Sequence, residues 1–452
     1  MAVAKLKSAL QQSSGRSKPW SGARLLNCFV EKADGDKRDD YALMATPGTT
    51  VFAAVGSSPI RGERVVGDLV YVVSGAELYS VDNAGSSTLL GMVGGGSGRV
   101  RMADNGTQIC IADGGVPYVW DGTSLTTPVL PAAVSDVAYI DGYIIWTFDG
   151  TDQFIISSLD NALIYDFLDI ATVEGAPDFL VGVIVDHREI QFYGKSTVEI
   201  WYNSGAADFP FERQGNAFIE RGCFDRDSLI KIDNSVHFVG DDRIIYRLSG
   251  YDPQRISTHA IEYALRGATY HRGFVYTQEG HKFYGLWTDS GTFLYDMATG
   301  AWHERQSFGM GFWRMGGAFE FNGSAYFTDN QNGNIYLASL DVNDENGATI
   351  SVQVELPTIE CGDRSRITMH SFEVLCETGV GSTTVEPIIS LQYSDDGGRN
   401  YSKEMQRTLG LVGSYRTRAI WRKLGQFRQR QMRITMTDSY RRFVIGYFAD
   451  IR

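Results

Sequence analysis

The sequence has few cysteines and lacks any apolar run long enough to span a membrane. It has five Cys residues, an odd number, which are widely spaced and form no Cys-x-x-Cys motif. This pattern argues against a disulfide framework and predicts buried, reduced thiols in a protein folded in the cytosol. The first twenty residues are polar and lack the apolar core of a signal peptide. Since no stretch of 18 apolar residues occurs, direct membrane insertion is not expected.

Basic residues are scarce in most of the chain but not at its C-terminal end. Residues 1–350 carry 26 Lys and Arg against 43 Asp and Glu, whereas residues 351–452 carry 15 against 11. An acidic body repels phosphates, so general nucleic-acid binding is not expected. An acidic channel through which DNA slides without sticking is compatible with this charge.

Helix signals are almost absent, and the pattern favours an all-β fold. The sequence has 50 Gly and 12% aromatics, which suits short strands joined by tight turns. Asp-Gly and Asn-Gly pairs, typical of hairpin turns, recur along the chain, and two of them flank the β run at 143–148. The best helix candidate is 258–265, with Ser257 or Thr258 as its N-cap.

An aromatic residue in a β run, followed by a polar turn, recurs at intervals of 36 to 49 residues. The repeated positions are Tyr79, Tyr118, Tyr165, Trp201, Tyr246, Tyr295 and Tyr336. Four-stranded propeller blades have about this length. Because the repeat is degenerate, it predicts a β-propeller of six or seven blades.

The pattern changes near residue 345, where longer alternating runs begin. These runs, at 350–356, 367–375, 388–393 and 430–436, predict a C-terminal antiparallel β-sandwich. Residues 394–401 fit the Asp-box pattern Ser-x-Asp-x-Gly-x-x-aromatic, which is a structured turn and not a catalytic motif. We therefore expect a flexible N-terminal arm at 1–20, a propeller at 21–345 and a sandwich at 346–452.

Arginine is concentrated near the C-terminus. Between residues 413 and 442, nine basic residues face a single acidic residue, Asp438. The candidate interface residues are Arg416, Arg418, Arg422, Lys423, Arg428, Arg430 and Arg433. One interpretation is a solvated strand pair. The other is a docking surface for an acidic partner, such as the acidic body of a neighbouring copy, or for DNA, because guanidinium groups pair with carboxylates and phosphates.

Motifs for catalysis and ligand binding fail on spacing or context. Residues 194–197 end like a P-loop, but the required first Gly is replaced by Glu189. Residues 341–352 begin like a calcium loop, but position twelve is Val352. The seven His are scattered, and no Gly-x-Ser-x-Gly elbow occurs. We therefore expect no enzyme activity, no metal and no cofactor.

Eight short segments, in order along nearly the whole chain, carry a family resemblance. They are NCFVE at 27–31, ATPGT at 45–49, DGTD at 149–152, FYGKSTVE at 192–199, PFER at 210–213, IERGC at 219–223, PQRIST at 253–258 and WRKLG at 421–425. With them the chain resembles the packaged-DNA-stabilisation or tail-hub proteins of short-tailed bacteriophages.

The resemblance implies a structural role in the virion. Such proteins assemble as a ring, typically of six copies, below the portal and its head-to-tail adaptor. They close the exit after DNA packaging and offer sites for a tail needle or plug and for tailspikes or fibres. DNA is then a partner only in transit, and assembly takes place in the host cytoplasm. The alternative is a glycan-binding or glycan-cleaving propeller protein of a phage tail, which the aromatic content and the Asp-box favour.

Overall fold

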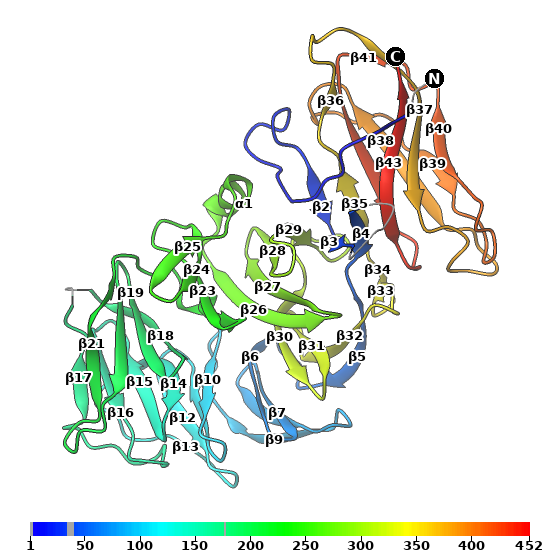
Figure 1. The fold of residues 1–452 in the computed structure, drawn as a ribbon. Coiled ribbons are helices and arrows are strands. Elements are labelled where there is room, and N and C mark those ends of the chain that lie inside the picture. The colour runs from blue at the N-terminus through cyan, green and yellow to red at the C-terminus, as the bar shows by residue number, and fades with distance from the viewer. Residues whose placement is uncertain (1–2, 34–39, 176–177) are drawn as a thin grey trace.

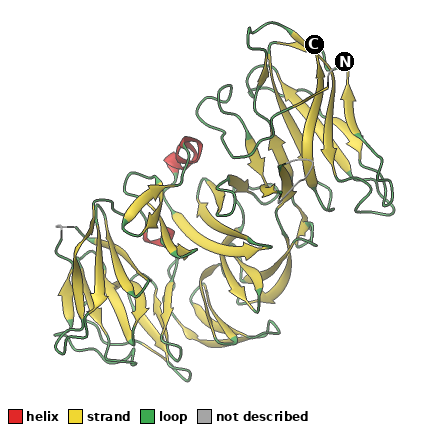
Figure 2. Ribbon diagram, in the orientation of Figure 1, coloured by secondary structure: helices red, strands yellow, loops and turns green. Residues whose placement is uncertain are grey.

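A computed structural model describes residues 3–33, 40–175 and 178–452 of the chain. Strands make up nearly all of its regular structure (Figure 2). In the described ranges the helical elements are α1 (His259–Ala264) and the 3-10 turns η1 (Arg226–Ser228) and η2 (Leu265–Gly267). Thr258 caps α1 by accepting a hydrogen bond from the Ile261 N–H, which confirms the helix predicted from the sequence.

Four-stranded antiparallel units form the larger lobe, a β-propeller (Figure 1). Five units are separate sheets: β6–β9 (Ile60–Val66, Leu69–Ser74, Glu77–Val81, Ser87–Met92), β10–β13 (Arg101–Asp104, Ile109–Ala112, Pro117–Trp120, Leu125–Thr126), β14–β17 (Val134–Ile140, Tyr143–Phe148, Gln153–Ile156, Ile170–Thr172), β18–β21 (Leu180–Asp186, Glu189–Gly194, Val198–Asn203, Phe211–Ile219) and β22–β25 (Ile230–Ile232, Ser235–Val239, Ile245–Ser249, Asp252–Arg255).

Two further four-stranded units belong to larger sheets and complete the propeller. One is β26–β29 (His271–Gln278, His281–Thr288, Gly291–Asp296, Trp302–Arg305). The other joins β30–β32 (Met315–Phe321, Ser324–Asp329, Asn334–Ser339) to β5 (Gly48–Ala54), which comes from the N-terminal side of the ring. The first strands β6, β10, β14, β18, β22, β26 and β30 are neighbours around a central axis, and β30 meets β6. Because β5 pairs with β32, the ring is closed by strands from both ends of the propeller.

The aromatic repeat marks one strand of each unit. Six of its seven members lie on the third strand, in β8, β12, β20, β24, β28 and β32. Tyr165 is the exception, because it lies in the loop after the third strand β16, where its hydroxyl accepts a hydrogen bond from the Trp146 indole. The repeat therefore reports the four-stranded unit itself.

The second lobe is a two-sheet β-sandwich, as predicted. One sheet has the order β3 (Cys28–Lys32), β4 (Tyr41–Ala45), β43 (Phe443–Ile451), β37 (Ile367–Cys376) and β40 (Ala419–Arg422), with β1 (Val3–Lys5) on β43 and β41 (Gln426–Phe427) on β37. The other contains β2 (Arg24–Leu26), β35 (Val352–Glu355), β42 (Gln429–Met436), β38 (Ile388–Ser394) and β39 (Met405–Thr408), with β36 (Ile359–Glu360) on β42. Phe372, Trp421 and Ile434 are among the buried side chains between the sheets.

One sheet runs without interruption from the propeller into the sandwich. Strand β2 pairs in parallel with β29 of the propeller and antiparallel with β35 of the sandwich. The carboxylate of Glu304 on β29 accepts hydrogen bonds from Nε and Nη2 of Arg24 at 2.8 and 2.6 Å. The short strands β33 (Asp344–Glu345) and β34 (Ala348–Thr349) extend the sheet that contains β5. The two lobes are thus joined by backbone pairing as well as by the chain.

The N-terminal part of the chain differs from the sequence-based expectation. In place of a flexible arm at 1–20, strand β1 pairs with β43, and Ala9 is 1% exposed. Strands β2, β3 and β4, assigned from the sequence to the propeller at 21–345, pair with strands of the sandwich. The physical reason is that the sandwich core accepts their apolar side chains, including Leu25, Val30 and Leu43.

Candidate interaction surfaces and the propeller axis

The candidate arginines of the sandwich divide into buried and exposed groups. Arg430 is 1% exposed, and its guanidinium donates to both Asp395 carboxylate oxygens at 2.6 and 2.7 Å and to the Leu424 carbonyl at 2.6 Å. It also lies 4.0 Å above the ring centre of Tyr393 and 4.1 Å from that of Phe427. This guanidinium is fully engaged within the sandwich.

Arg433 is also held within the fold. Its Nε donates to the Glu355 carboxylate at 2.8 Å, and its guanidinium lies 3.3 Å from the ring centre of Tyr401. Glu355 is 2% exposed, so the ion pair joins β42 to β35 in a largely buried position. Arg430 and Arg433 are therefore both held by contacts within the sandwich.

The other candidate residues lie on the surface near the edge strand β40. Arg416, Arg418, Arg422, Lys423 and Arg428 are exposed. Arg418 pairs with Glu373 on the neighbouring strand β37, at 2.8 and 2.7 Å. No side-chain partner for the other four is found in the described part of the chain. Tyr415, which is 70% exposed, lies beside Arg416 in the sequence.

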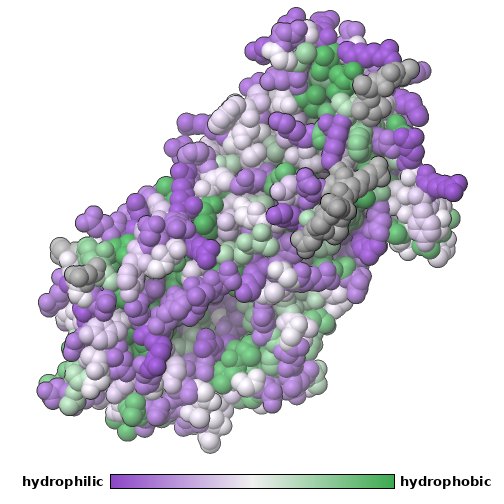
Figure 3. Space-filling view, viewed as in Figure 1, coloured by the Kyte–Doolittle hydropathy of each residue, from purple (hydrophilic) through white to green (hydrophobic). Residues whose placement is uncertain are grey.

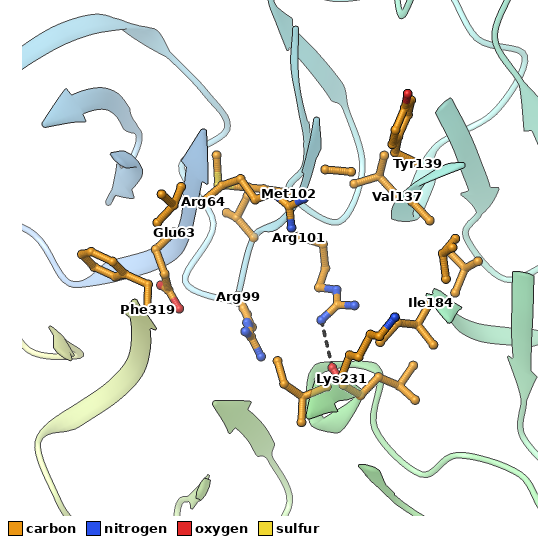
Figure 4. Close-up of a pocket in the computed structure, with 18 of the residues that line it drawn as sticks. Glu63, Arg64, Arg99, Arg101, Met102, Val137, Tyr139, Ile184, Lys231 and Phe319 are labelled. Carbon is orange, nitrogen blue, oxygen red and sulfur yellow. Dashed lines mark hydrogen bonds between the residues drawn. The ribbon is translucent and has the colours of Figure 1, made fainter. Parts of the chain in front are cut away.

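The propeller axis encloses a cavity of about 570 Å³, lined by the first strands of six units (Figure 4). Arg64, Arg99, Arg101 and Lys231 lie around it with Glu63. Three of the cations pair with carboxylates, one of them Arg101 with Asp136. Arg64 pairs with Asp104 at 2.6 Å, and Lys231 pairs with Asp186 at 2.7 Å. The surface is hollowed near the middle of the propeller, with hydrophilic residues around the hollow (Figure 3).

Arginines from non-neighbouring units bridge this axis. Nη1 of Arg99, which precedes β10, donates to the carbonyls of Asp227 and Gly273 on the far side, at 2.8 and 2.9 Å. Arg101 on β10 donates to the Asp136 carboxylate at 3.0 Å and, across the axis, to the Leu229 carbonyl at 3.3 Å (Figure 4). Hydrogen-bonded side chains therefore cross the propeller axis, which is not an open passage.

The Asp-box turn is structural, as expected. Ser394 donates to the Asp396 carboxylate at 2.7 Å, and the same oxygen accepts the backbone N–H groups of Arg399 and Asn400 at 3.0 and 2.9 Å. These hydrogen bonds, from the Asn400 N–H first, lower the pKa of Asp396. The carboxylate is committed to the turn and has no geometry for acid–base catalysis.

Four of the five thiols are buried and unreactive. Cys28, Cys110, Cys223 and Cys376 are buried, and Cys361 is partly exposed. Burial raises the pKa of the Cys28, Cys223 and Cys376 thiols to about 12, so they stay protonated at neutral pH.

Neither a metal cluster nor a membrane-spanning helix is found in the described residues. In these ranges no three His, Cys, Asp or Glu side chains come together so as to hold a metal ion. Across the same ranges, no helix has the length and apolar character needed to cross a bilayer.

Comparison with known families accounts for nearly the whole chain. Residues 18–342 match the family model described as bacteriophage P22 Gp10, beta-propeller, and residues 359–452 match the model described as bacteriophage P22 Gp10, beta-sandwich. The chain belongs to the P22 Gp10 family. The two matches follow the order of the two lobes and confirm a propeller followed by a sandwich.

A curated relative supports the assignment over part of the chain. The chain is 26% identical over 220 residues to the tail hub protein gp10 of Salmonella phage P22, covering 44% of this chain and 45% of the relative. The match thus spans less than half of the length of this relative.

Solved structures are only distantly similar. BamB from Moraxella catarrhalis matches with a TM-score of 0.41 and 8% identity over 75% of this chain and all of that one. The computationally designed Ika8 protein matches with a TM-score of 0.39 and 12% identity, over 74% of this chain and 99% of that one. These scores are too low to support any inference about function.

Proposed function

We propose that this chain is a structural tail hub protein of a bacteriophage virion that acts by binding and not by catalysis. The observation that carries the proposal is the match of both lobes, in order, to the two domains of the P22 Gp10 family. The pairing of β2 with β29 and with β35 fits this role, because it links the propeller to the sandwich through backbone hydrogen bonds.

The proposed assembly is a ring of six copies below the portal and its head-to-tail adaptor. In this position it closes the channel after packaging, retains the genome and anchors a tail needle and tailspikes or fibres. The family resemblance supports these partners. The protein is assembled in the host cytoplasm and resides in the virion tail.

The exposed basic residues of the sandwich are the proposed contact with a neighbouring copy or with the adaptor. The buried pairs of Arg430 and Arg433 limit this surface to Arg416, Arg418, Arg422, Lys423 and Arg428. The acidic propeller of a neighbouring copy has the complementary charge, since residues 1–350 are strongly acidic.

Any DNA transit takes place through the ring and not through one propeller. The axis of the propeller is bridged by Arg99 and Arg101, whose hydrogen bonds join opposite units. An acidic surface around a central ring channel lets DNA pass with little attraction.

The glycan-cleaving alternative needs an arginine triad beside paired carboxylates in one pocket. Three arginines, Arg61, Arg99 and Arg272, do line one cavity, but no carboxylate lines it among the described residues. Glycoside hydrolysis uses two carboxyl groups that flank the scissile bond. The arrangement therefore favours the binding of an anion and gives no support to glycan cleavage.

Assembly on portal–adaptor complexes tests the proposed function. The purified protein is mixed with these complexes and examined by electron microscopy. We expect a ring on the adaptor with the wild type, and loss of that ring with the double variant Arg422→Glu and Arg428→Glu, whose monomer stays folded. The double variant Arg188→Glu and Arg266→Glu, an equal charge change at two exposed residues of the propeller, is the control and assembles normally. Failure of the wild type to join the complexes, together with full and infectious capsids after deletion, rejects the proposal.

A further inference from the structure

A second cavity, of about 360 Å³, lies near the start of the first strands β6 and β26 of the propeller, and Arg99 lines both this cavity and the axial one. Its walls include Arg61 at the start of β6, Arg272 at the start of β26, and Arg99 between them. The cavity is also lined by two aromatic residues, Tyr270 and Trp287, and by the amide of Asn330. We call this cavity the arginine pocket.

Arg61 is fixed by backbone carbonyls and keeps one nitrogen unused. Its Nε donates to the Gly98 carbonyl at 2.8 Å, and its Nη1 donates to the carbonyls of Gly75 and Gly94 at 2.9 and 2.7 Å. The residue is 4% exposed, yet its buried Nη2 has no hydrogen-bond partner. A buried N–H of a charged group without an acceptor is costly, so an acceptor at this position is stabilising.

Arg272, from the strand β26, shows the same pattern in the lining of the pocket. Its Nη2 donates to the Glu63 carboxylate at 2.8 Å, and its Nη1 donates to the Ile60 carbonyl at 3.2 Å. The residue is 5% exposed, and its buried Nε has no partner. Beside it, the buried Oδ1 of Asn330 also lacks a partner. Three polar atoms, from two guanidinium groups and one amide, are thus left unsatisfied around one cavity.

Three guanidinium groups line the pocket, and no carboxylate is part of its lining among the described residues. Arg99 uses Nη1 for two carbonyl oxygens, and neither of its other nitrogens takes part in a hydrogen bond within the described part of the chain. Burial, with the nearby charges of Arg272 and Arg101, lowers the pKa of Arg99 to about 10. Behind the lining, Glu63 pairs with Arg272, and the carboxylates of Asp227 and Asp113 lie near Arg99 and Arg61 without a hydrogen bond to them in the described part of the chain.

We propose that the arginine pocket binds a compact oxyanion, a carboxylate or a phosphate group. Guanidinium groups that are held in place by carbonyls present fixed N–H donors, which suit the oxygens of such an anion. The rings of Tyr270 and Trp287, which pack edge to face with their centres 6.0 Å apart, give the rest of the ligand an apolar wall. The open side of Gly98, where a Cβ would meet no atom within 4 Å, leaves room for it. The site is independent of the ring assembly proposed above.

Calorimetry on the full chain tests this site with three defined probes. Sodium phosphate, sodium acetate and sodium glucuronate are titrated at matched ionic strength, with chloride as the reference anion. We expect saturable binding at one site per chain by at least one probe, with a rise in Tm. The tightest probe identifies the source: phosphate indicates a phosphoryl group, glucuronate a sugar carboxylate, and acetate a simple carboxylate. If none of the three probes binds more tightly or raises Tm more than chloride does, the proposal is overturned.

A single substitution places the proposed anion inside the pocket permanently. Asn330→Asp adds a carboxylate beside Arg272. We expect it to raise Tm in buffer free of the probes and to weaken binding of the tightest probe by about tenfold or more. The control Asn346→Asp makes the same change on an exposed turn and leaves both unchanged. Unaltered binding by Asn330→Asp rejects the site.

A measurement on the wild type alone covers the case in which Asn330→Asp does not fold. Crystals of the full chain are soaked in selenate, an anomalously scattering oxyanion. We expect a selenium peak between Arg61, Arg99 and Arg272, with oxygen within hydrogen-bond distance of Arg61 Nη2. Absence of a peak at this position, with selenate bound elsewhere or not at all, overturns the proposal.

Discussion

Nε2 of His281 in the propeller lies 3.1 Å from a carboxylate oxygen of Glu31 on strand β3 of the sandwich. Its Nδ1 lies 2.9 Å from the Asp296 carboxylate. A neutral imidazole has one N–H and satisfies one of these two carboxylates, whereas the protonated ring donates to both. The link between the lobes therefore depends on the charge of His281.

The first prediction is that this link weakens as pH rises. The hydrogen bond with Asp296, and to a lesser extent the one with Glu31, raise the pKa of His281 above its ordinary value of about 6.5. A raised pKa contributes stability that is fully present below the unfolded value and is lost as pH rises through the folded value. The Tm advantage of the wild type over His281→Gln is expected to be largest near pH 6 and to shrink towards pH 8.

Differential scanning calorimetry between these pH values measures the effect. A charged hydrogen bond contributes about 1.5–3 kcal/mol, which sets the scale of the change. The control is His259→Gln, since that ring is 86% exposed. Parallel Tm curves of the wild type and His281→Gln across the range would show that His281 carries no such charge.

The second prediction separates the arginines of the sandwich. Arg430→Ala removes three hydrogen bonds and the stacking on Tyr393 and Phe427, so we expect a loss of about 2–4 kcal/mol in the free energy of unfolding. Arg422→Ala removes an exposed side chain, and we expect it to change the free energy of unfolding by less than about 0.5 kcal/mol. Urea unfolding followed by circular dichroism compares the two. Equal effects would contradict the division of these residues into structural and surface groups.

The third prediction concerns Asn27, at the junction of the lobes. Its backbone has φ +53°, its Nδ2 donates to the carbonyls of Gln306 and Ser351, and its Oδ1 accepts the Gln306 N–H, each at 2.9 Å. Asn27→Gly keeps the backbone conformation and loses these hydrogen bonds, which is expected to cost about 2–3 kcal/mol. Asn27→Ala is expected to lose about 1 kcal/mol more than Asn27→Gly, because a Cβ is unfavourable at this φ.

Hydrogen exchange on strand β2 provides the matching measurement. We expect faster exchange of the Leu25 and Leu26 amides in Asn27→Gly, and faster still in Asn27→Ala, because the junction opens more often. Exchange in β11, far from the junction in the propeller, serves as the internal reference. If the two variants leave the exchange of β2 at the wild-type rate, Asn27 does not hold the junction.

The propeller was open to prediction from the sequence because its signal is local. Each unit repeats strand, turn and aromatic within a few tens of residues, as Tyr295 and Trp302 show on β28 and β29. The junction between the lobes could not be predicted in this way. Its strand β2 pairs with β29 and β35, which are both more than 250 residues away from it in the sequence. No local pattern distinguishes a strand that pairs at such a distance from one that pairs with its neighbour.

The candidate surface was only partly predictable for the same reason. Arg430 and Arg422 have the same basic, alternating surroundings in the sequence, yet Arg430 is buried against Asp395 and Arg422 is exposed. The difference depends on the partner strand that faces each position. The arginine pocket was missed entirely, because Arg61, Arg99 and Arg272 come from different units and are brought together only by ring closure.

The fourth prediction explains why two of the family segments, FYGKSTVE and IERGC, are built as they are. A Cβ on Gly222 would lie 2.0 Å from the Lys195 carbonyl oxygen and 2.3 Å from the Ser196 nitrogen, both backbone atoms. The next residue, Cys223, donates its N–H to the Gly194 carbonyl at 2.9 Å. Gly222 is therefore required for the close approach of two chain segments, and the phosphate-loop-like Gly194–Thr197 sequence serves packing.

Gly222→Ala is expected to destabilise the propeller by about 1–3 kcal/mol, measured as a lower urea midpoint. Gly215→Ala, where a Cβ meets no atom within 4 Å, is the matched control and stays within about 0.5 kcal/mol of the wild type. An unchanged midpoint for Gly222→Ala would mean that the two segments separate without cost, against the contact seen here.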